Sequence, residues 1–249
     1  AGFFVMGISA YHLLKKQHID FFTRSFKIGL VFALVFSIFI AIEGDQHAVH
    51  VTKMQPEKLA AMEAHWDTTT EAPIHLFAIP DQKNERNLIQ FGSIPGVLSF
   101  LGHHDIHAEV KGLKDFPKKD RPPVLLTFVS FRLMVALGGY FILMTVYGFI
   151  RRNKLLESPR YLRLMLWSIP LPYLAIQFGW LVAELGRQPW IVYHLMRTSD
   201  AVSPIAVSQV AVSLAAFLLA YGFLGAIDFY LIAINAKKGP QAAAPVASG

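Results

Sequence analysis

Cysteine is absent from the 249 residues of this chain. The absence excludes disulfides, thiolate metal sites and thiol nucleophiles, so a metal would have to be held by His, Met, Glu or Asp. Charged residues are also sparse, at 16% of the chain. The sequence begins inside an apolar run, with neither an initiating Met nor the basic leader of a signal peptide. We therefore expect it to be the later part of a longer protein.

Apolar residues, by contrast, make up 54% of the chain, and phenylalanine alone contributes 20 residues. This content is too high for an ordinary soluble domain and predicts an integral membrane protein. The formal net charge of +6 does not indicate a nucleic-acid partner, because the basic residues gather beside apolar runs, where they orient spans. We therefore expect most of the chain to lie in a lipid bilayer.

The apolar runs predict an all-α membrane protein, a bundle of about five transmembrane helices with one large extramembrane loop. Residues 1–43 would contain two segments, the first of them truncated, and residues 124–238 would contain three more. The polar residues 44–123 would form the loop, and residues 239–249 a disordered tail. Basic residues follow the first, third and last segments, which places the loop on the outer side of the membrane.

The loop is predicted to contain a short amphipathic helix. Pro56 suits the first turn of a helix, and residues 57–66 are good helix formers. At roughly 100° per residue, Glu63 falls inside an apolar stripe and Lys58 lies at its border. Burial would raise the pKa of Glu63, which could then accept a proton from a neutral donor such as a quinol hydroxyl, while Lys58 holds an oxygen of the same headgroup. The alternative is a solvated helix whose charged residues face water.

The predicted spans contain isolated charges. Arg132 lies inside the third span, where a charged side chain costs on the order of 2.5 to 3.5 kcal/mol unless a partner, such as a haem propionate, compensates. Glu184 and Arg187, at the end of the fourth, are three residues apart and could pair on one helix face. Asp228, in the fifth, could deliver protons from the cytoplasm or form a hydrogen bond between helices. Pro170 and Pro172 predict a bend in the fourth span.

Three histidines in the loop raise the question of a metal. His103 and His107 are four residues apart and would share a helix face, as zinc ligands often do, with His104 beside them. The spacing identifies no further ligand. A surface histidine cluster is therefore the favoured prediction.

Three stretches resemble motifs of one family. They are QPEKLAAMEAHWDT after GDQ, SFRLMVALG from Ser130, and GWLVAELGRQPW from Gly179. In this order they are similar to the quinol-binding Q-loop, the low-spin haem segment and the GRQPW motif of subunit I of cytochrome bd quinol oxidases. The resemblance extends to about residue 235. It implies a multi-pass subunit of the bacterial inner (plasma) membrane that oxidises quinol at the outer face, at Lys58 and Glu63, and reduces oxygen to water.

The same resemblance implies haem sites. The cofactors would be a low-spin haem b, a high-spin haem b and haem d. A Met normally fills gaps in a core, but its thioether can also bind haem iron. The family's pattern makes Met134 the ligand of the low-spin haem b iron, with Arg132 two residues before it. Glu184 would bind the high-spin haem iron, and Arg187 would lie close to haem carboxylates.

The implied partners are quinol, molecular oxygen, a second oxidase subunit with a small single-span subunit, and the N-terminal part of subunit I, which would carry the family's His ligands. Two alternatives stay open. One is a haem-free membrane transporter or channel in which Arg132, Glu184 and Asp228 line an ion path. The other is a haem b subunit that transfers electrons from quinol without reducing oxygen.

Overall fold

The computed structural model describes residues 1–240, and its chain divides into two units, Ala1–Ala201 and Val202–Gly249. Most of the predicted tail, residues 241–249, lies outside the described residues. The first unit contains a helical bundle and the loop. The second contains one long helix, and each unit is described by itself.

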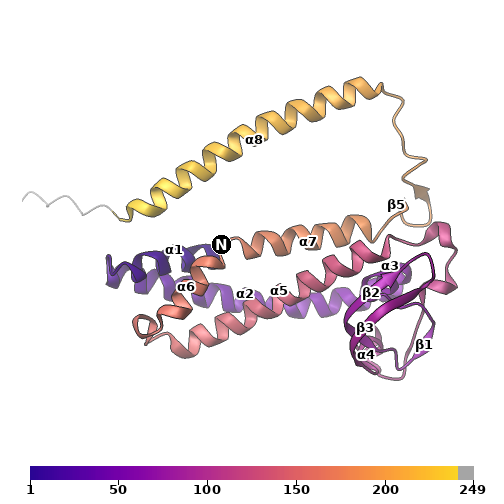
Figure 1. The fold of residues 1–249 in the computed structure, drawn as a ribbon, viewed down its shortest axis with the longest axis horizontal. Coiled ribbons are helices and arrows are strands. Elements are labelled where there is room, and N and C mark those ends of the chain that lie inside the picture. The colour runs from indigo at the N-terminus through magenta and orange to yellow at the C-terminus, as the bar shows by residue number, and fades with distance from the viewer. Residues whose placement is uncertain (241–249) are drawn as a thin grey trace, which may run out of the picture. The chain divides into compact units, whose positions relative to one another are not determined.

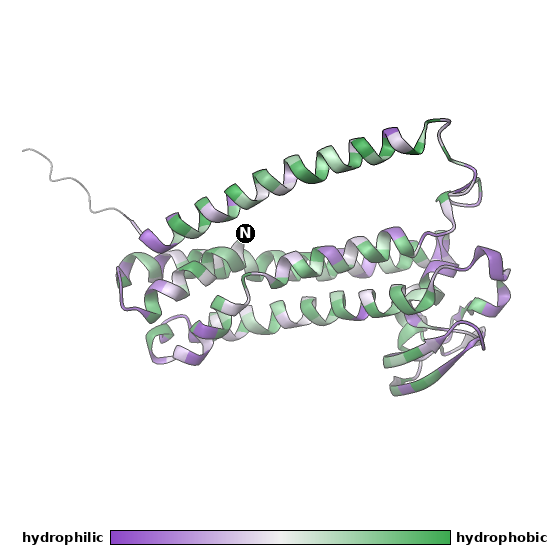
Figure 2. Cartoon of the chain, turned by 45° about the horizontal axis from the view of Figure 1, so that its top comes forward, coloured by the Kyte–Doolittle hydropathy of each residue, from purple (hydrophilic) through white to green (hydrophobic). Residues whose placement is uncertain are grey.

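The first unit is built on five helices that pack side by side (Figure 1). They are α1 (Gly2–Leu14), α2 (Ile19–Met54), α5 (Val124–Arg151), α6 (Pro159–Trp167) and α7 (Leu171–Leu185). Helix α1 packs against α2 and α6, while α5 packs against α2 and α7. Their apolar residues run along the bundle, whereas polar residues gather in the loop (Figure 2). Buried aromatic and aliphatic side chains, among them Phe26, Leu30 and Met165, form the core between the helices.

The residues described include three helices that are long and apolar enough to cross a membrane, namely α2, α5 and α8 (Val207–Lys238). A fourth span results if α6 and α7, which meet at 42°, are taken together. This angle confirms the bend predicted at Pro170 and Pro172. The bend forms because both prolines lack the backbone N–H that a continuous helix needs. Helix α1 is apolar but shorter, at 13 residues. The protein is thus mostly helical, with three to four candidate spans.

Helix α2 extends beyond residues 1–43, where the sequence predicted the first two membrane segments. It continues through Gly44 to Met54 and contains 36 residues, a length of about 54 Å. No proline interrupts this continuation, and the Thr52 hydroxyl donates to the Ala48 carbonyl, 2.8 Å away. The end of α2 packs against α4 (Val97–His103). The irregular part of the loop therefore begins after Met54 and not at residue 44.

The all-α prediction is wrong for the loop, which contains a β-hairpin. Strands β2 (Ile74–Asp81) and β3 (Arg86–Ile94) are antiparallel, with Phe77 opposite Phe91. The Asp81 carboxylate accepts the backbone N–H groups of Lys83 and Asn84 and so stabilises the turn. Two further two-stranded pairs are β1 (Thr69–Thr70) with β4 (Glu109–Val110), and β5 (Trp190–Val192) with β6 (Met196–Arg197).

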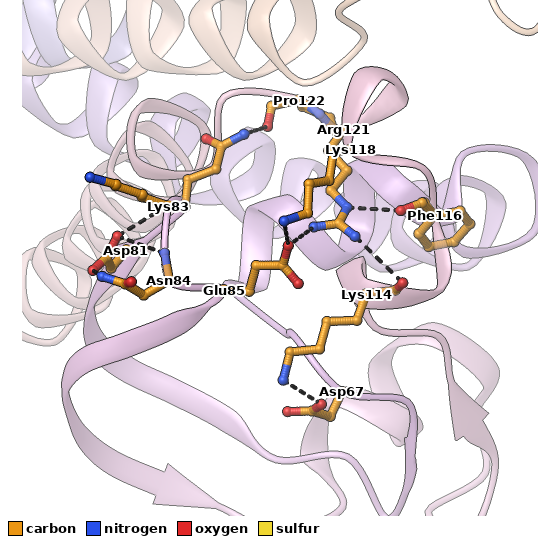
Figure 3. Close-up of polar contacts among 11 residues, drawn as sticks. Asp67, Asp81, Lys83, Asn84, Glu85, Lys114, Phe116, Lys118, Arg121 and Pro122 are labelled. Atoms are coloured by element: carbon orange, nitrogen blue, oxygen red, sulfur yellow. Dashed lines mark hydrogen bonds and ion pairs between the residues drawn. The ribbon is translucent and has the colours of Figure 1, made fainter.

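The end of the loop folds back on the hairpin turn through charged side chains (Figure 3). It contains the 3-10 turns η1 (Leu113–Asp115) and η2 (Lys118–Asp120), and a third turn, η3 (Leu155–Glu157), follows α5. Glu85 accepts from Lys118 at 2.5 Å and from Arg121 at 3.2 Å, and Arg121 Nε donates to the Phe116 carbonyl. These contacts hold the hairpin turn against the end of the loop, just before the start of α5.

Candidate functional site

The loop helix α3 (Pro56–Glu63) is the element on which the site is built. It begins at Pro56, as predicted, but it ends at Glu63 and not at Trp66. The reason is Ala64, which adopts a left-handed conformation with φ +51° and turns the chain away. Trp66 is buried beyond this turn, and its Nε1 donates to Oδ1 of Asn87 at 2.9 Å. The hairpin thereby fixes the C-terminal end of α3.

Small residues place α3 directly on the transmembrane helix α5. Ala60 and Ala61 are fully buried in a cluster that includes Phe128 of α5 and Ala78 of the hairpin. The absence of larger side chains allows the two helices to approach closely. The polar residues of α3 are therefore held against the loop end of the bundle.

Glu63 forms a buried ion pair with Arg132 of α5. Only 3% of the Glu63 side chain is exposed, and its Oε2 and Oε1 accept from the two terminal nitrogens of Arg132 at 2.5 and 3.4 Å. The intramembrane Arg132 therefore finds its compensating partner within this chain, where the sequence had suggested a haem propionate. Burial raises the pKa of Glu63, and the positive charge of Arg132 offsets part of that increase.

Lys58 lies over the segment that follows α7. A Cβ built on Gly186 would lie 3.1 Å from both Cγ and Cε of Lys58, so glycine permits this close approach. Burial lowers the pKa of Lys58; the positive charge of Arg187 lowers it further, and the Glu184 carboxylate raises it. Glu184 and Arg187 form the pair that their spacing suggested, at 2.5 Å, with about 40% of each side chain exposed. Lys58 and Glu63 thus face different partners.

Met134 lies at the contact between α5 and α7. A Cβ built on Gly179 of α7 would be 3.1 Å from its sulfur, so the thioether faces a position without a side chain. Two residues of a helix turn through roughly 200°. Arg132 and Met134 consequently point to different sides of α5, the first toward the loop helix and the second toward α7.

Several buried donors at this end of the bundle fit a ligand that carries carboxylate groups, as haem does. Within residues 1–240, Nε of Arg132, Nε of Arg187 and Nε1 of Trp190 are buried and have no hydrogen-bond partner. Buried polar groups are normally paired. These unpaired N–H groups suit haem carboxylates, and the Met134 thioether is of a type that can bind haem iron.

The remaining predicted residues lie elsewhere. In the loop, His104 pairs with Asp45 at 3.1 Å and His107 with Glu71 at 2.8 Å. The part of the chain that the structure describes contains no group of three or more His, Asp or Glu side chains suited to a metal ion. Asp228 lies on α8, where its side chain is exposed within the second unit.

One further pair beside the site has no signal in the sequence. Glu57, directly before Lys58, is 4% exposed and accepts from Nε2 of His194 at 3.0 Å. The two residues are 137 positions apart. A carboxylate in the first turn of a helix is common, because the helix dipole favours it there, so Glu57 did not stand out.

Comparison with known proteins identifies the family of the chain. The family model for cytochrome bd terminal oxidase subunit I matches residues 1–240. Cytochrome bd ubiquinol oxidase subunit 1 of Bacillus subtilis (strain 168) is 38% identical over 96% of this chain and 54% of its own length. Cytochrome bd-II ubiquinol oxidase subunit 1 of Escherichia coli (strain K12) is 30% identical over 96% of this chain and 60% of its own.

A solved structure shows the same fold. The bd oxidase from Geobacillus thermodenitrificans matches with a TM-score of 0.84 and 30% identity, covering 96% of this chain and 55% of that one. The chain spans about half the length of the curated relatives it matches.

Proposed function

Because the chain belongs to the cytochrome bd terminal oxidase subunit I family, we propose that it is part of a quinol oxidase that oxidises quinol at the outer membrane face and reduces oxygen to water. The observation that carries the proposal is the buried Glu63–Arg132 pair, which joins the loop helix to α5 two residues before Met134. Glu63, suited to quinol chemistry, is thus bound to the same helix that carries the candidate haem ligand Met134, which faces α7. Charged residues on a solvated loop would not give this arrangement.

Lys58 and Glu63 are the residues that act on quinol in this proposal. The Lys58 amine donates to one oxygen of the ring and so orients it. The Glu63 carboxylate accepts the proton of a quinol hydroxyl, a transfer favoured by the raised pKa of its buried carboxyl. Arg132 holds the carboxylate through two hydrogen bonds. The proton then leaves toward the outer side, where we place the loop.

Four residues of this chain would hold haem. Met134 would bind the iron of a low-spin haem b, and Glu184 would bind the iron of a high-spin haem b beside haem d. Arg132 and Arg187 would bind haem carboxylates. Haem, when bound, supplies iron that takes up and passes on single electrons. Glu184 is already paired with Arg187, so this pair would have to open or share its carboxylate. The family's His ligands, a second subunit and a small single-span subunit would complete the assembly in the bacterial plasma membrane.

The test uses the complete oxidase purified from its membrane. A reduced-minus-oxidised visible spectrum should show haem bands, and added quinol should drive oxygen uptake. A haem-free transporter with Arg132, Glu184 and Asp228 along an ion path would show no such bands. Haem bands without quinol-dependent oxygen uptake would instead indicate an electron-transfer subunit, and either result would contradict the proposal.

A further inference from the structure

The segment after Arg187 returns to the first turn of α3. Strands β5 and β6 form a short hairpin, and His194 lies in its turn. Its imidazole is bonded to Glu57, and 58% of that histidine side chain is exposed while the carboxylate is buried. An exposed imidazole therefore closes over a buried acidic group on the loop helix.

The backbone at His194 adopts a conformation that suits glycine better than histidine. Its φ is +58°, in the left-handed region that glycine adopts without strain and other residues rarely adopt. The ring is further held by stacking on Tyr193, with centroids 4.2 Å apart, and by contact with Trp190 at 5.3 Å. A strained backbone combined with three side-chain contacts fixes the position of the imidazole.

The same hairpin has a second attachment that does not involve α3. Arg197 of β6 forms an ion pair with Asp120 of η2, and its guanidinium lies 4.7 Å from the centre of the Trp190 ring. This attachment joins the hairpin to the end of the loop. The bond between His194 and Glu57 is the one that reaches the residue next to Lys58.

Lys58 is consequently placed from two sides by the segment that contains Arg187. Its side chain lies over Gly186, directly before Arg187. Its neighbour Glu57 is bonded to His194, seven residues after Arg187. We propose that Glu57 and His194 are positioning residues that hold Lys58 against this segment and thereby set the affinity for quinol. The inference rests on the proposed function.

A simpler role for Glu57 would be to stabilise the N-terminal end of α3 through the helix dipole. That role needs no histidine. A simpler role for His194 would be to form the hairpin turn, and glycine would serve that role better. Two substitutions of His194 distinguish these simpler roles from the positioning role, because the two interpretations predict opposite results for them.

The test compares His194→Gly with His194→Gln in the complete oxidase. The glycine variant relieves the backbone but removes the bond, whereas the glutamine variant keeps an N–H donor on a less favourable backbone. We expect the glycine variant to raise the quinol KM about tenfold with kcat within about twofold, and the glutamine variant to stay close to wild type. The reverse order would show that only the turn matters and would overturn the inference.

His104→Gly is the matched control. His104 also has a left-handed backbone, with φ +55°, and also bonds a carboxylate, that of Asp45, at 3.1 Å. This pair is exposed and distant in sequence from Lys58, so the quinol KM should not change. A rise equal to that of His194→Gly would mean that any such loss disturbs the loop, and the inference would fail.

Two further measurements separate this inference from the proposed function. Adding His194→Gly to Lys58→Ala should raise KM no further, because the histidine acts through the lysine; additive effects would overturn the inference. Amide hydrogen exchange in α3 should be faster in His194→Gly and unchanged in His104→Gly, a readout that needs no activity. Unchanged exchange in His194→Gly would overturn the inference, whereas a wild-type complex that fails to oxidise quinol would overturn the proposed function.

Discussion

Glu63 is held between two opposing influences: the surrounding apolar side chains disfavour its charge, and Arg132 favours it. A base must be unprotonated to act, so kcat/KM for quinol should fall as the pH drops through the pKa of Glu63. Since that pKa is raised above 4.5, the fall should begin above that pH. The pH profile of quinol oxidation measures it directly.

Substitutions of Arg132, the partner of Glu63, provide a control for this pH prediction. Arg132→Gln removes the charge that lowers the pKa of Glu63, so the acid-side fall in kcat/KM should move to higher pH. Arg132→Lys retains a positive charge and should move it less. A profile that does not shift in Arg132→Gln would show that another group controls the acid side.

At Met134 the expected effect is spectroscopic. Met134→Leu nearly conserves side-chain volume, so packing alone should cost less than about 1.5 kcal/mol. We expect loss of the low-spin haem signal or its conversion to high spin, because leucine has no sulfur to bind iron. Met165→Leu, a fully buried methionine of α6, is the control and should leave the spectrum unchanged. An unchanged spectrum in Met134→Leu would refute the ligand assignment.

Glu184 has two possible roles, a surface ion pair with Arg187 or a ligand of haem iron, and the size of the effect of its substitution distinguishes them. An ion pair this exposed contributes only about 0 to 1 kcal/mol, so a purely structural role predicts little loss of stability or activity on substitution. If Glu184 binds haem iron, Glu184→Ala should lose or disturb a high-spin haem and abolish oxygen reduction. The haem spectrum and oxygen uptake of the variant distinguish these outcomes, and a full haem complement with normal uptake would favour the structural role.

Among the elements, the close crossing of two loop segments at Gly112 is sensitive to substitution, because backbone atoms lie where a side chain would begin. A Cβ built there would lie 2.4 Å from backbone atoms of Trp66 and Asp67, and the flanking Leu113 N–H donates to the His65 carbonyl at 2.9 Å. Gly112→Ala should therefore force the segments apart, lowering stability by roughly 1 to 3 kcal/mol. Limited proteolysis should cut the loop faster. Gly44→Ala, whose Cβ would meet nothing within 4 Å, should not change the rate.

The elements also show what sequence reasoning could reach. Proline chemistry located the start of α3 at Pro56 and the bend before α7. The end of α3 was not predictable, because Ala64 is an ordinary helix former and only tertiary packing turns it left-handed. The hairpin had a detectable signal that was not used: apolar runs on either side of the polar turn DQKNE.

At the candidate site, the sequence marks Glu63 and Arg132 separately as unusual charges, but it does not show that they pair. Glu63 in an apolar stripe and Arg132 in an apolar span each required a partner, yet they are 69 residues apart. Two uncompensated opposite charges in one apolar protein are a reason to pair them. The bond between His194 and Glu57 could not be predicted from the sequence, because neither residue type at its position indicates a long-range contact.

For the whole molecule, the absence of cysteine makes orientation straightforward to measure. Single cysteines at Lys83, in the turn of the β2–β3 hairpin, and at Lys154, after α5, would be the chain's only thiols. A maleimide that cannot cross membranes should label Lys83→Cys in intact cells and Lys154→Cys only after permeabilisation, as expected if the basic segments lie inside. The opposite pattern would place the loop in the cytoplasm.

The position of the Glu63–Arg132 pair along α5 has a consequence for how a donor arrives. Arg132 is eight residues past Val124, about 12 Å along a helix whose total length of about 42 Å exceeds the roughly 30 Å of hydrocarbon in a bilayer. With the hydrocarbon centred on α5, Arg132 would lie about 6 Å inside its loop-side boundary, so the pair would be within reach of the lipid phase. On the proposed function, quinol would arrive by lateral diffusion within the lipid, and the enzyme would respond to the mole fraction of quinol in the membrane. Diluting the membrane with added lipid, at constant total quinol, would then slow turnover without any change in the protein.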